Sequence, residues 1–177
     1  MTPYRIGSGA GYAGDRIDPA LDLAERGELD ALVFECLAER TIALAQLRRA
    51  ADPNAGYDPM LQARMRAVLP ACVRNGVTVI TNMGAAHPMA AGQAVLDVAR
   101  ELGLPRLRVA VVTGDDVLPW VQANDVPLMD SPDTVRSLDG RLVSANAYLG
   151  ADALLTALQA DVNVIITGRV ADPSLFL

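Results

Sequence analysis

The stretch Ala31-Leu32-Val33-Phe34-Glu35 is apolar at four consecutive positions and then ends on a carboxylate. A strand with no polar face is typical of a parallel sheet that helices cover on both sides. Four further short apolar runs share this character: Tyr4–Ile6, Val77–Ile80, Arg108–Val112 and Val162–Ile166. The sequence therefore predicts five buried strands.

Segments of helical period separate these runs, at about 19–26, 38–50, 59–75, 88–102 and 151–160. The alternation predicts an α/β fold: a doubly wound, mostly parallel five-stranded sheet, Rossmann-like, with helices on both faces. Pro70 is expected to kink or split its helix because it removes a backbone donor. Asp139-Gly140, between Thr134–Arg136 and Leu142–Ala145, predicts a small β-hairpin near 134–146.

The chain of 177 residues has the size of one domain. Near its end, Asp172-Pro173 repeats a helix-start pattern, but only four residues follow. Such a short segment does not make a stable helix. We therefore expect residues 1–177 to be a single α/β domain that forms the N-terminal part of a longer protein.

The composition excludes several classes of function. All fifteen basic residues are arginine, so no lysine can form a Schiff base or a Walker A phosphate contact. The net charge of −6 disfavours nucleic acid and anionic membranes as partners. With one histidine and two cysteines the chain lacks the ligands of a structural zinc site. The cysteines, without a secretory signal, indicate reduced thiols and a cytoplasmic location.

Polar residues and glycines follow the ends of the predicted strands. Ligands of open parallel sheets bind beyond the carboxyl ends of the strands, so these residues are candidates for a site. The candidate catalytic residues are Glu35, His87, Asp115 and Asp116. The candidate binding residues are Gly9, Gly11, Gly14, Asp15, Arg16, Asn82, Thr113, Gly168 and Arg169. The hypothesis requires that the stretch Gly9–Arg16 lies at the same edge of the sheet as Glu35, Asp115 and Arg169.

Each candidate has an alternative interpretation. Arg16 and Arg169 are forked donors for a carboxylate or phosphate, or else surface ion-pair partners. The adjacent aspartates could bind a divalent ion, divide acid and base roles, or cap a helix. Glu35 in an apolar run must be paired or protonated, which suits a tuned catalytic group or an arginine partner. His87 is a general base or an ordinary loop residue, and the thiolate of Cys36 is disfavoured beside Glu35.

The glycines at 9, 11 and 14 match the dinucleotide pattern G-x-G-x-x-G, with Glu35 twenty-one residues beyond Gly14. In a true fingerprint the helix starts within the glycines, whereas Asp18-Pro19 delays it here. Asp15 would also place negative charge beside the phosphates. The loop is therefore an NAD(P) site, a turn that approaches another ligand, or a packing device.

Five blocks of sequence resemble the acyclic terpene utilisation (AtuA) family along essentially the whole chain. They are GAGYAGDRIDPA (9–20), LVFECLAERT (32–41), TNMGAA (81–86), VTGDD (112–116) and ITGRVADPS (166–174). The resemblance implies a role in the catabolism of acyclic terpenoids and branched acids through acyl-CoA intermediates. It assigns no reaction and no catalytic residue.

These observations give three hypotheses of function. The first is an enzyme that hydrates, isomerises or cleaves a carboxylate or acyl-CoA thioester, held by Arg16 and Arg169. The second is a nicotinamide-dependent oxidoreductase that uses the glycine loop. The third is a non-catalytic binding or assembly subunit. The sequence requires no cofactor, although a divalent metal is compatible with the first hypothesis. We expect a homo-oligomer, or a partnership with the missing C-terminal segment.

Overall fold

The computed structural model describes residues 3–177, and its centre is an open sheet of five parallel strands. The strands are β1 (Ile6–Ala10), β2 (Ala31–Phe34), β3 (Thr78–Thr81), β4 (Val109–Val112) and β5 (Val164–Thr167). Their order across the sheet is β1-β2-β3-β5-β4, and each neighbouring pair is parallel. The predicted α/β fold is confirmed.

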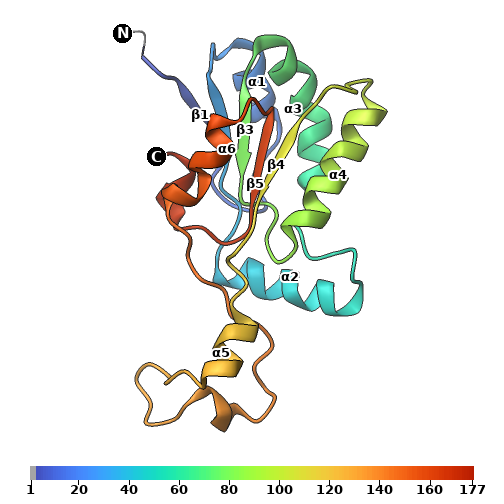
Figure 1. Ribbon diagram of the computed structural model, residues 1–177. Helices are drawn as coiled ribbons and strands as arrows, with labels where there is room; N and C mark the ends of the chain where they lie inside the picture. The colour runs from blue at the N-terminus through green and yellow to red at the C-terminus, as the bar shows by residue number, and fades with distance from the viewer. Residues whose placement is uncertain (1–2) are drawn as a thin grey trace.

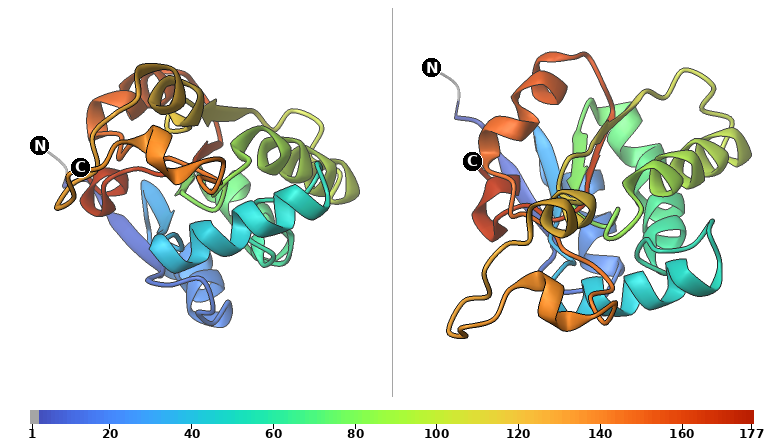
Figure 2. Two further views of the ribbon diagram at one scale, coloured as in Figure 1. Left: turned by 90° about the horizontal axis from the view of Figure 1, so that it is seen from below. Right: turned by 60° about the horizontal axis from the view of Figure 1, so that its bottom comes forward.

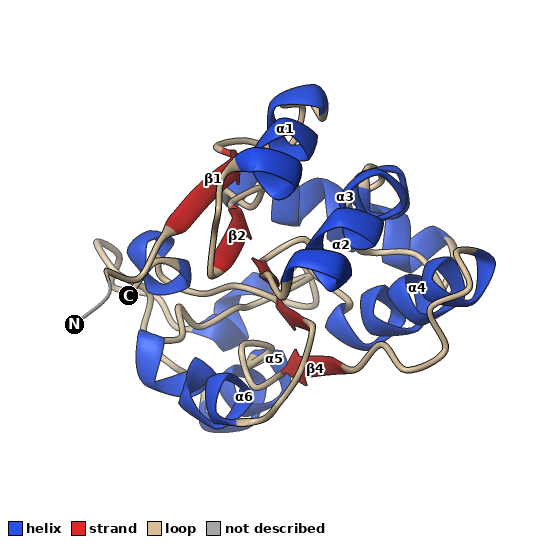
Figure 3. Cartoon of the chain, turned by 90° about the horizontal axis from the view of Figure 1, so that it is seen from above, coloured by secondary structure: helices blue, strands red, loops and turns tan. Residues whose placement is uncertain are grey.

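Helical segments cover both faces of the sheet (Figures 1 and 3). Helices α1 (Asp18–Arg26), α3 (Leu61–Asn75) and α4 (Pro88–Glu101) cover one face, where Leu32 and Phe34 of β2 join the larger core. The short segments η2 (Ala151–Leu154), α6 (Leu155–Gln159) and η3 (Asp172–Leu175) cover the other, where Ala31 and Val33 belong to a second cluster. Consecutive apolar residues in β2 thus supply two cores.

The winding of the chain reverses at β5, which inserts between β3 and β4. After β3 the chain continues into α4 on one face, whereas after β5 it continues into η3 on the other. A crevice forms beyond the carboxyl ends of two such strands, and it is the usual ligand position in open α/β sheets. The fold therefore places a candidate site at the ends of β3 and β5.

Helix α2 (Glu39–Ala51) belongs to neither layer. It lies across the carboxyl ends of the strands (Figure 1, and Figure 2, left). Its buried residue is Ala45, while Leu44 and Leu47 are exposed. The helix therefore covers the candidate site and adds little to the core.

The predicted hairpin near 134–146 is wrong. Residues 113–148 form an arm that projects beyond the sheet and contains α5 (Leu118–Asn124) and η1 (Val135–Leu138) (Figure 1). Asp139 and Gly140 do have positive φ angles, as a tight turn requires. However, Thr134 bridges Pro127 and Asn146 bridges Asp116, so the flanking segments pair elsewhere.

Two local predictions also need correction. Strand β1 extends to Ala10, so Gly7 and Gly9 lie inside a strand and not in a loop. A Cβ on Gly9 would lie 2.8 Å from the Phe34 ring, which shows that the glycine permits close packing of β1 on β2. Pro70 lies within α3, which runs from Leu61 to Asn75, so the proline does not split the helix. Burial of Leu69, Ala71 and Cys72 around it holds the helix together.

Within residues 3–177, none of the helices combines the length and the apolar character needed to cross a bilayer.

Gly84, just beyond β3, allows the close approach of β3 and β5. A Cβ there would overlap the Thr167 carbonyl oxygen and lie 2.9 Å from Cα of Pro88. We expect Gly84→Ala to lower the free energy of unfolding by about 1–3 kcal/mol through overpacking. Gly11→Ala is the control, because a Cβ at Gly11 meets nothing within 4 Å. Urea denaturation of both variants checks this, and equal stabilities would contradict it.

Candidate functional site

Two pockets lie at the carboxyl edge of the sheet. We call them the His87 pocket, of about 200 Å³, and the apolar pocket, of about 260 Å³. Both lie just below the range of about 300–1,000 Å³ that is usual for small-molecule sites. Either one suits a small ligand or part of a larger one, and neither encloses a whole dinucleotide.

The His87 pocket brings together four of the predicted residues. His87 precedes α4, while Thr113, Asp115 and Asp116 follow β4. All four line the pocket, together with Arg49 from α2 and Asn146 from the end of the arm. Turns that are remote along the chain therefore meet because parallel strands end at one edge of the sheet.

Asp115 is held firmly at the base of this pocket. The residue is buried, and its Oδ2 accepts hydrogen bonds from the Arg169 backbone N–H at 2.9 Å and from Asn146 Nδ2 at 3.0 Å. Its carbonyl oxygen accepts a hydrogen bond from Ala147 N–H at 2.7 Å. A Cβ on Gly168 would lie 2.5 Å from the same carboxylate, so a larger residue there would displace the carboxylate. Asp115 thus joins the ends of β4, β5 and the arm.

His87 is half-buried at the wall of the pocket. Its Nδ1 lies 3.2 Å from the carbonyl oxygen of Ala55. A carbonyl can only accept, so in a neutral ring this contact favours the proton on Nδ1 and the lone pair on Nε2. This contact favours the tautomer that a general base needs.

Arg49 is the cation of the His87 pocket, and the sequence analysis did not identify it. Its Nη1 donates to the Ala86 carbonyl oxygen at 2.7 Å and lies 3.9 Å from Asp116 Oδ2. The side chain is 38% exposed, so guanidinium donors remain available to a ligand. Nothing in the periodicity of α2 distinguishes Arg49 from Arg40 or Arg48, so only the fold could single it out.

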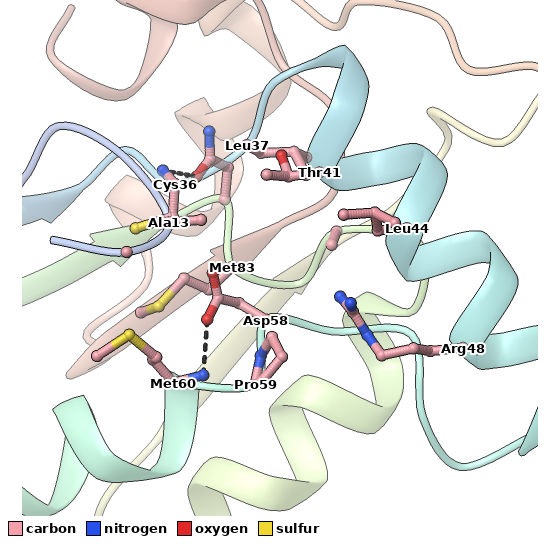
Figure 4. A pocket seen from close by; sticks show the side chains of 13 residues that line it. Ala13, Cys36, Leu37, Thr41, Leu44, Arg48, Asp58, Pro59, Met60 and Met83 are labelled. Carbon is pink, nitrogen blue, oxygen red and sulfur yellow. Dashed lines mark hydrogen bonds between the residues drawn. The ribbon is translucent and has the colours of Figure 1, made fainter.

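The apolar pocket (Figure 4) shares the 82–87 loop with the His87 pocket: Asn82, Met83 and Ala85 line the apolar pocket, and Ala86 and His87 line the other. Ala13 and Gly14 of the glycine loop also line the apolar pocket, with Leu37, Leu44, Met60 and Met83. Gly14 therefore lies in the same pocket wall as Asn82 and Cys36, whereas Asp115 lines the His87 pocket.

Asn82 lines the apolar pocket, while Glu35 lines neither of the two pockets. Asn82 is fully buried: its Oδ1 accepts from Cys36 N–H at 2.7 Å and its Nδ2 donates to Glu35 Oε1 at 2.8 Å. Glu35 Oε1 also accepts from Leu37 N–H at 3.1 Å. The structure thus separates Glu35 from Asp115 and Asp116, which sequence reasoning had grouped together.

Arg64 and Asp58 are further residues that sequence reasoning missed. The Arg64 side chain is fully buried, and its Nη2 donates to the carbonyl oxygens of Ala13 at 3.2 Å and Asp15 at 2.9 Å. Its Nη1 lies 2.8 Å from Cys36 Sγ. Arg64 occupies the apolar stripe of its helix with Leu61, Met65 and Val68, and an arginine on such a stripe was the available signal. Burial raises the pKa of Asp58, whose Oδ1 accepts from Met60 N–H at 2.7 Å.

The glycine loop does not have the geometry of a dinucleotide site. The Asp15 carboxylate accepts from Gly11 N–H at 3.0 Å and Arg16 N–H at 2.9 Å, and these bonds hold its pKa below the usual value. Asp15 thus occupies amides that a pyrophosphate would need. Arg16 pairs with Asp18 at the surface.

Arg169 is not exposed to a ligand as an anion clamp would be. Its side chain is 2% exposed, with Nη1 donating to the Leu37 carbonyl oxygen at 2.5 Å and Nη2 to Asp172 at 2.6 Å. The guanidinium carbon lies 3.9 Å from the centre of the Tyr148 ring. Arg169 thus fastens the end of β5 to the segment before α2. Between residues 3 and 177, no group of three or more His, Cys, Asp or Glu residues is arranged to hold a metal ion.

The family model described as "Acyclic terpene utilisation family protein AtuA" matches residues 4–177. The chain belongs to this family. The match spans all five blocks that carry the sequence resemblance, which is thereby confirmed, and it connects the chain with acyclic terpene utilisation. Neither a curated protein nor a solved structure gave a match.

The Asn82 amide is expected to matter for stability. Asn82→Leu leaves the buried Cys36 N–H without its acceptor and removes one of the two donors to Glu35 Oε1. We expect a loss of about 1–3 kcal/mol in the free energy of unfolding. Asn124→Leu, at an exposed amide that bonds only the Trp120 carbonyl, should change it by less than about 0.5 kcal/mol. Similar values for the two variants in urea denaturation would refute the role given to Asn82.

Both cysteines should be unreactive in the native protein. Burial raises the pKa of Cys36 and that of Cys72 to about 12, because it disfavours the thiolate. At pH 8 we expect the folded protein to resist iodoacetamide, while the protein in urea is alkylated at both positions. Mass spectrometry checks this, and rapid native alkylation of Cys36 would show that its thiolate is accessible.

Proposed function

We propose that this protein is an enzyme of acyclic terpenoid or branched-acid catabolism that acts on a carboxylic acid or its acyl-CoA thioester. The observation that carries the proposal is the His87 pocket, where His87, Asp115 and Asp116 meet beside Arg49. Family membership supports the class of substrate.

In the proposed mechanism Arg49 binds the carboxylate or thioester oxygen of the substrate. Its guanidinium is already oriented by the Ala86 carbonyl, and its contact with Asp116 at 3.9 Å is loose enough to yield to a ligand. Arg49 takes the role that the sequence analysis gave to Arg16 and Arg169. The small volume suits the reacting end of an acyl thioester, with the remainder outside.

His87 is the proposed general base, through Nε2. Hydration, isomerisation and carbon–carbon cleavage next to a carbonyl each require the transfer of a proton, and these are the reactions that the pocket suits. Asp116 at the rim, half-exposed, is the proposed second acid–base group. Asp115 is a positioning residue, because its hydrogen bonds join three segments that form the pocket wall.

Turnover of a panel of branched acids and their CoA thioesters tests the proposal. His87→Gln should lower kcat by at least about 100-fold, the usual contribution of a general base. Arg49→Gln should raise KM, because it removes the cation that binds the substrate. Arg40→Gln is the control: this residue is exposed on α2 and lines neither pocket.

Glu35→Gln separates this proposal from the assignment made from sequence. Loss of activity with His87→Gln but not with Glu35→Gln would support chemistry in the His87 pocket. The reverse result would move the chemistry to Glu35 and contradict the proposal. An absence of turnover with every compound would favour a binding or assembly subunit.

A further inference from the structure

The apolar pocket is a second hollow whose polar groups the proposed function does not use. Its walls come from the glycine loop, from the start and middle of α2, from the segment before α3 and from the 82–87 loop. Apolar side chains, including Leu37, Leu44, Met60 and Met83, make up most of its surface. Such walls favour a ligand with an aliphatic body.

Four polar side chains also line the pocket, and two of them are already paired. The Thr41 hydroxyl donates to the Ala38 carbonyl at 2.9 Å and accepts from Ala38 N–H at 2.7 Å. The Asn82 amide bonds Cys36 and Glu35. Both groups are therefore already engaged within the protein.

The other two, Arg48 and Asp58, remain available. Arg48 Nε is buried without a hydrogen-bond partner in the described part of the chain. Arg48 also takes part in none of the ion pairs between residues 3 and 177. Asp58 uses Oδ1 for Met60 N–H. Both side chains are labelled in the lining of this pocket in Figure 4, Arg48 from α2 and Asp58 from the segment before α3.

These two groups have complementary character. A guanidinium only donates and a carboxylate only accepts hydrogen bonds. A carboxylate ligand would gain Arg48 but face Asp58, and an ammonium ligand would gain Asp58 but face Arg48. A hydroxyl group can accept from Arg48 and donate to Asp58, and it adds no charge to an apolar enclosure, where an unbalanced charge is costly.

We infer that the apolar pocket is a binding site for a neutral aliphatic alcohol, whose hydroxyl group lies between Arg48 and Asp58. The inference does not depend on the proposed function, because it concerns a different pocket and different side chains. Arg48 and Arg49 are neighbours on α2 but line different pockets, so the helix contributes one cation to each.

Three probes with one carbon skeleton test the inference: 3-methylbutan-1-ol, 3-methylbutanoate and 3-methylbutan-1-amine. Protein with ¹³C-methyl methionine reports where each probe binds. Met60 and Met83 line the apolar pocket, Met89 lines the His87 pocket, and Met129 is 90% exposed on the arm. We expect the alcohol to shift the Met60 and Met83 resonances at the lowest concentration of the three probes, and Met129 to stay unchanged.

Two substitutions should change the preference in opposite directions. Arg48→Gln leaves the acceptor Asp58, so alcohol binding should weaken by about tenfold and the amine should become the preferred probe. Asp58→Asn turns an amide donor toward the pocket beside Arg48, so the acid should become preferred. Arg40→Gln should leave the order unchanged. Should Asp58→Asn not fold, the switch to the amine in Arg48→Gln alone decides.

The inference is overturned if the wild-type protein prefers either charged probe at Met60 and Met83, or if none of the probes shifts these resonances. A shift of Met89 by the acid, without any effect of the alcohol on Met60 and Met83, would overturn the inference and leave the proposed function standing. Shifts of Met60 and Met83 by the alcohol, with no turnover of any compound by the protein, would support the inference and contradict the proposed function.

Discussion

The requirement that buried polar groups find partners inside the protein governs the carboxyl edge of this sheet. Chain segments that leave the strands carry backbone N–H and C=O groups into a region covered by α2, and unpaired groups there would be costly. Asn82 and Asp115 meet this requirement at two places. Asn82 joins the end of β3 to the segment after β2, and Asp115 joins β4, β5 and the returning arm. The two pockets form around these fixed points.

Buried arginines meet the same requirement as donors, because they bond backbone carbonyl oxygens. Arg64 donates to the carbonyl oxygens of Ala13 and Asp15, and Arg169 donates to that of Leu37. A planar guanidinium with five donors can bond several carbonyl groups at once, which a lysine ammonium does less well. In a chain without lysine, buried arginines thus organise loops, while the half-buried Arg48 and Arg49 face the pockets.

Much of the architecture could be predicted from local pattern. Apolar runs such as Ala31–Phe34 and Val164–Ile166 form strands because burial on both faces favours apolar residues at consecutive positions. The hairpin failed because a turn at Asp139-Gly140 does not determine what its flanks pair with. The prediction of Gly9 as a binding-loop residue failed for a related reason. Gly9 makes room for the Phe34 ring of the neighbouring strand, and the spacing of glycines cannot reveal a contact between strands.

The sequence by itself determined the order of strands and helices along the chain, the family, and the edge of the sheet where polar residues gather. These features follow from periodicity and from motifs along the chain. Tertiary structure alone decided which of those residues share a pocket. His87, Asp115 and Asp116 meet, Glu35 stands apart with Asn82, and Arg169 is enclosed. The position of β5 between β3 and β4 and the path of α2 decide which residues come together. Both depend on contacts between segments far apart in sequence.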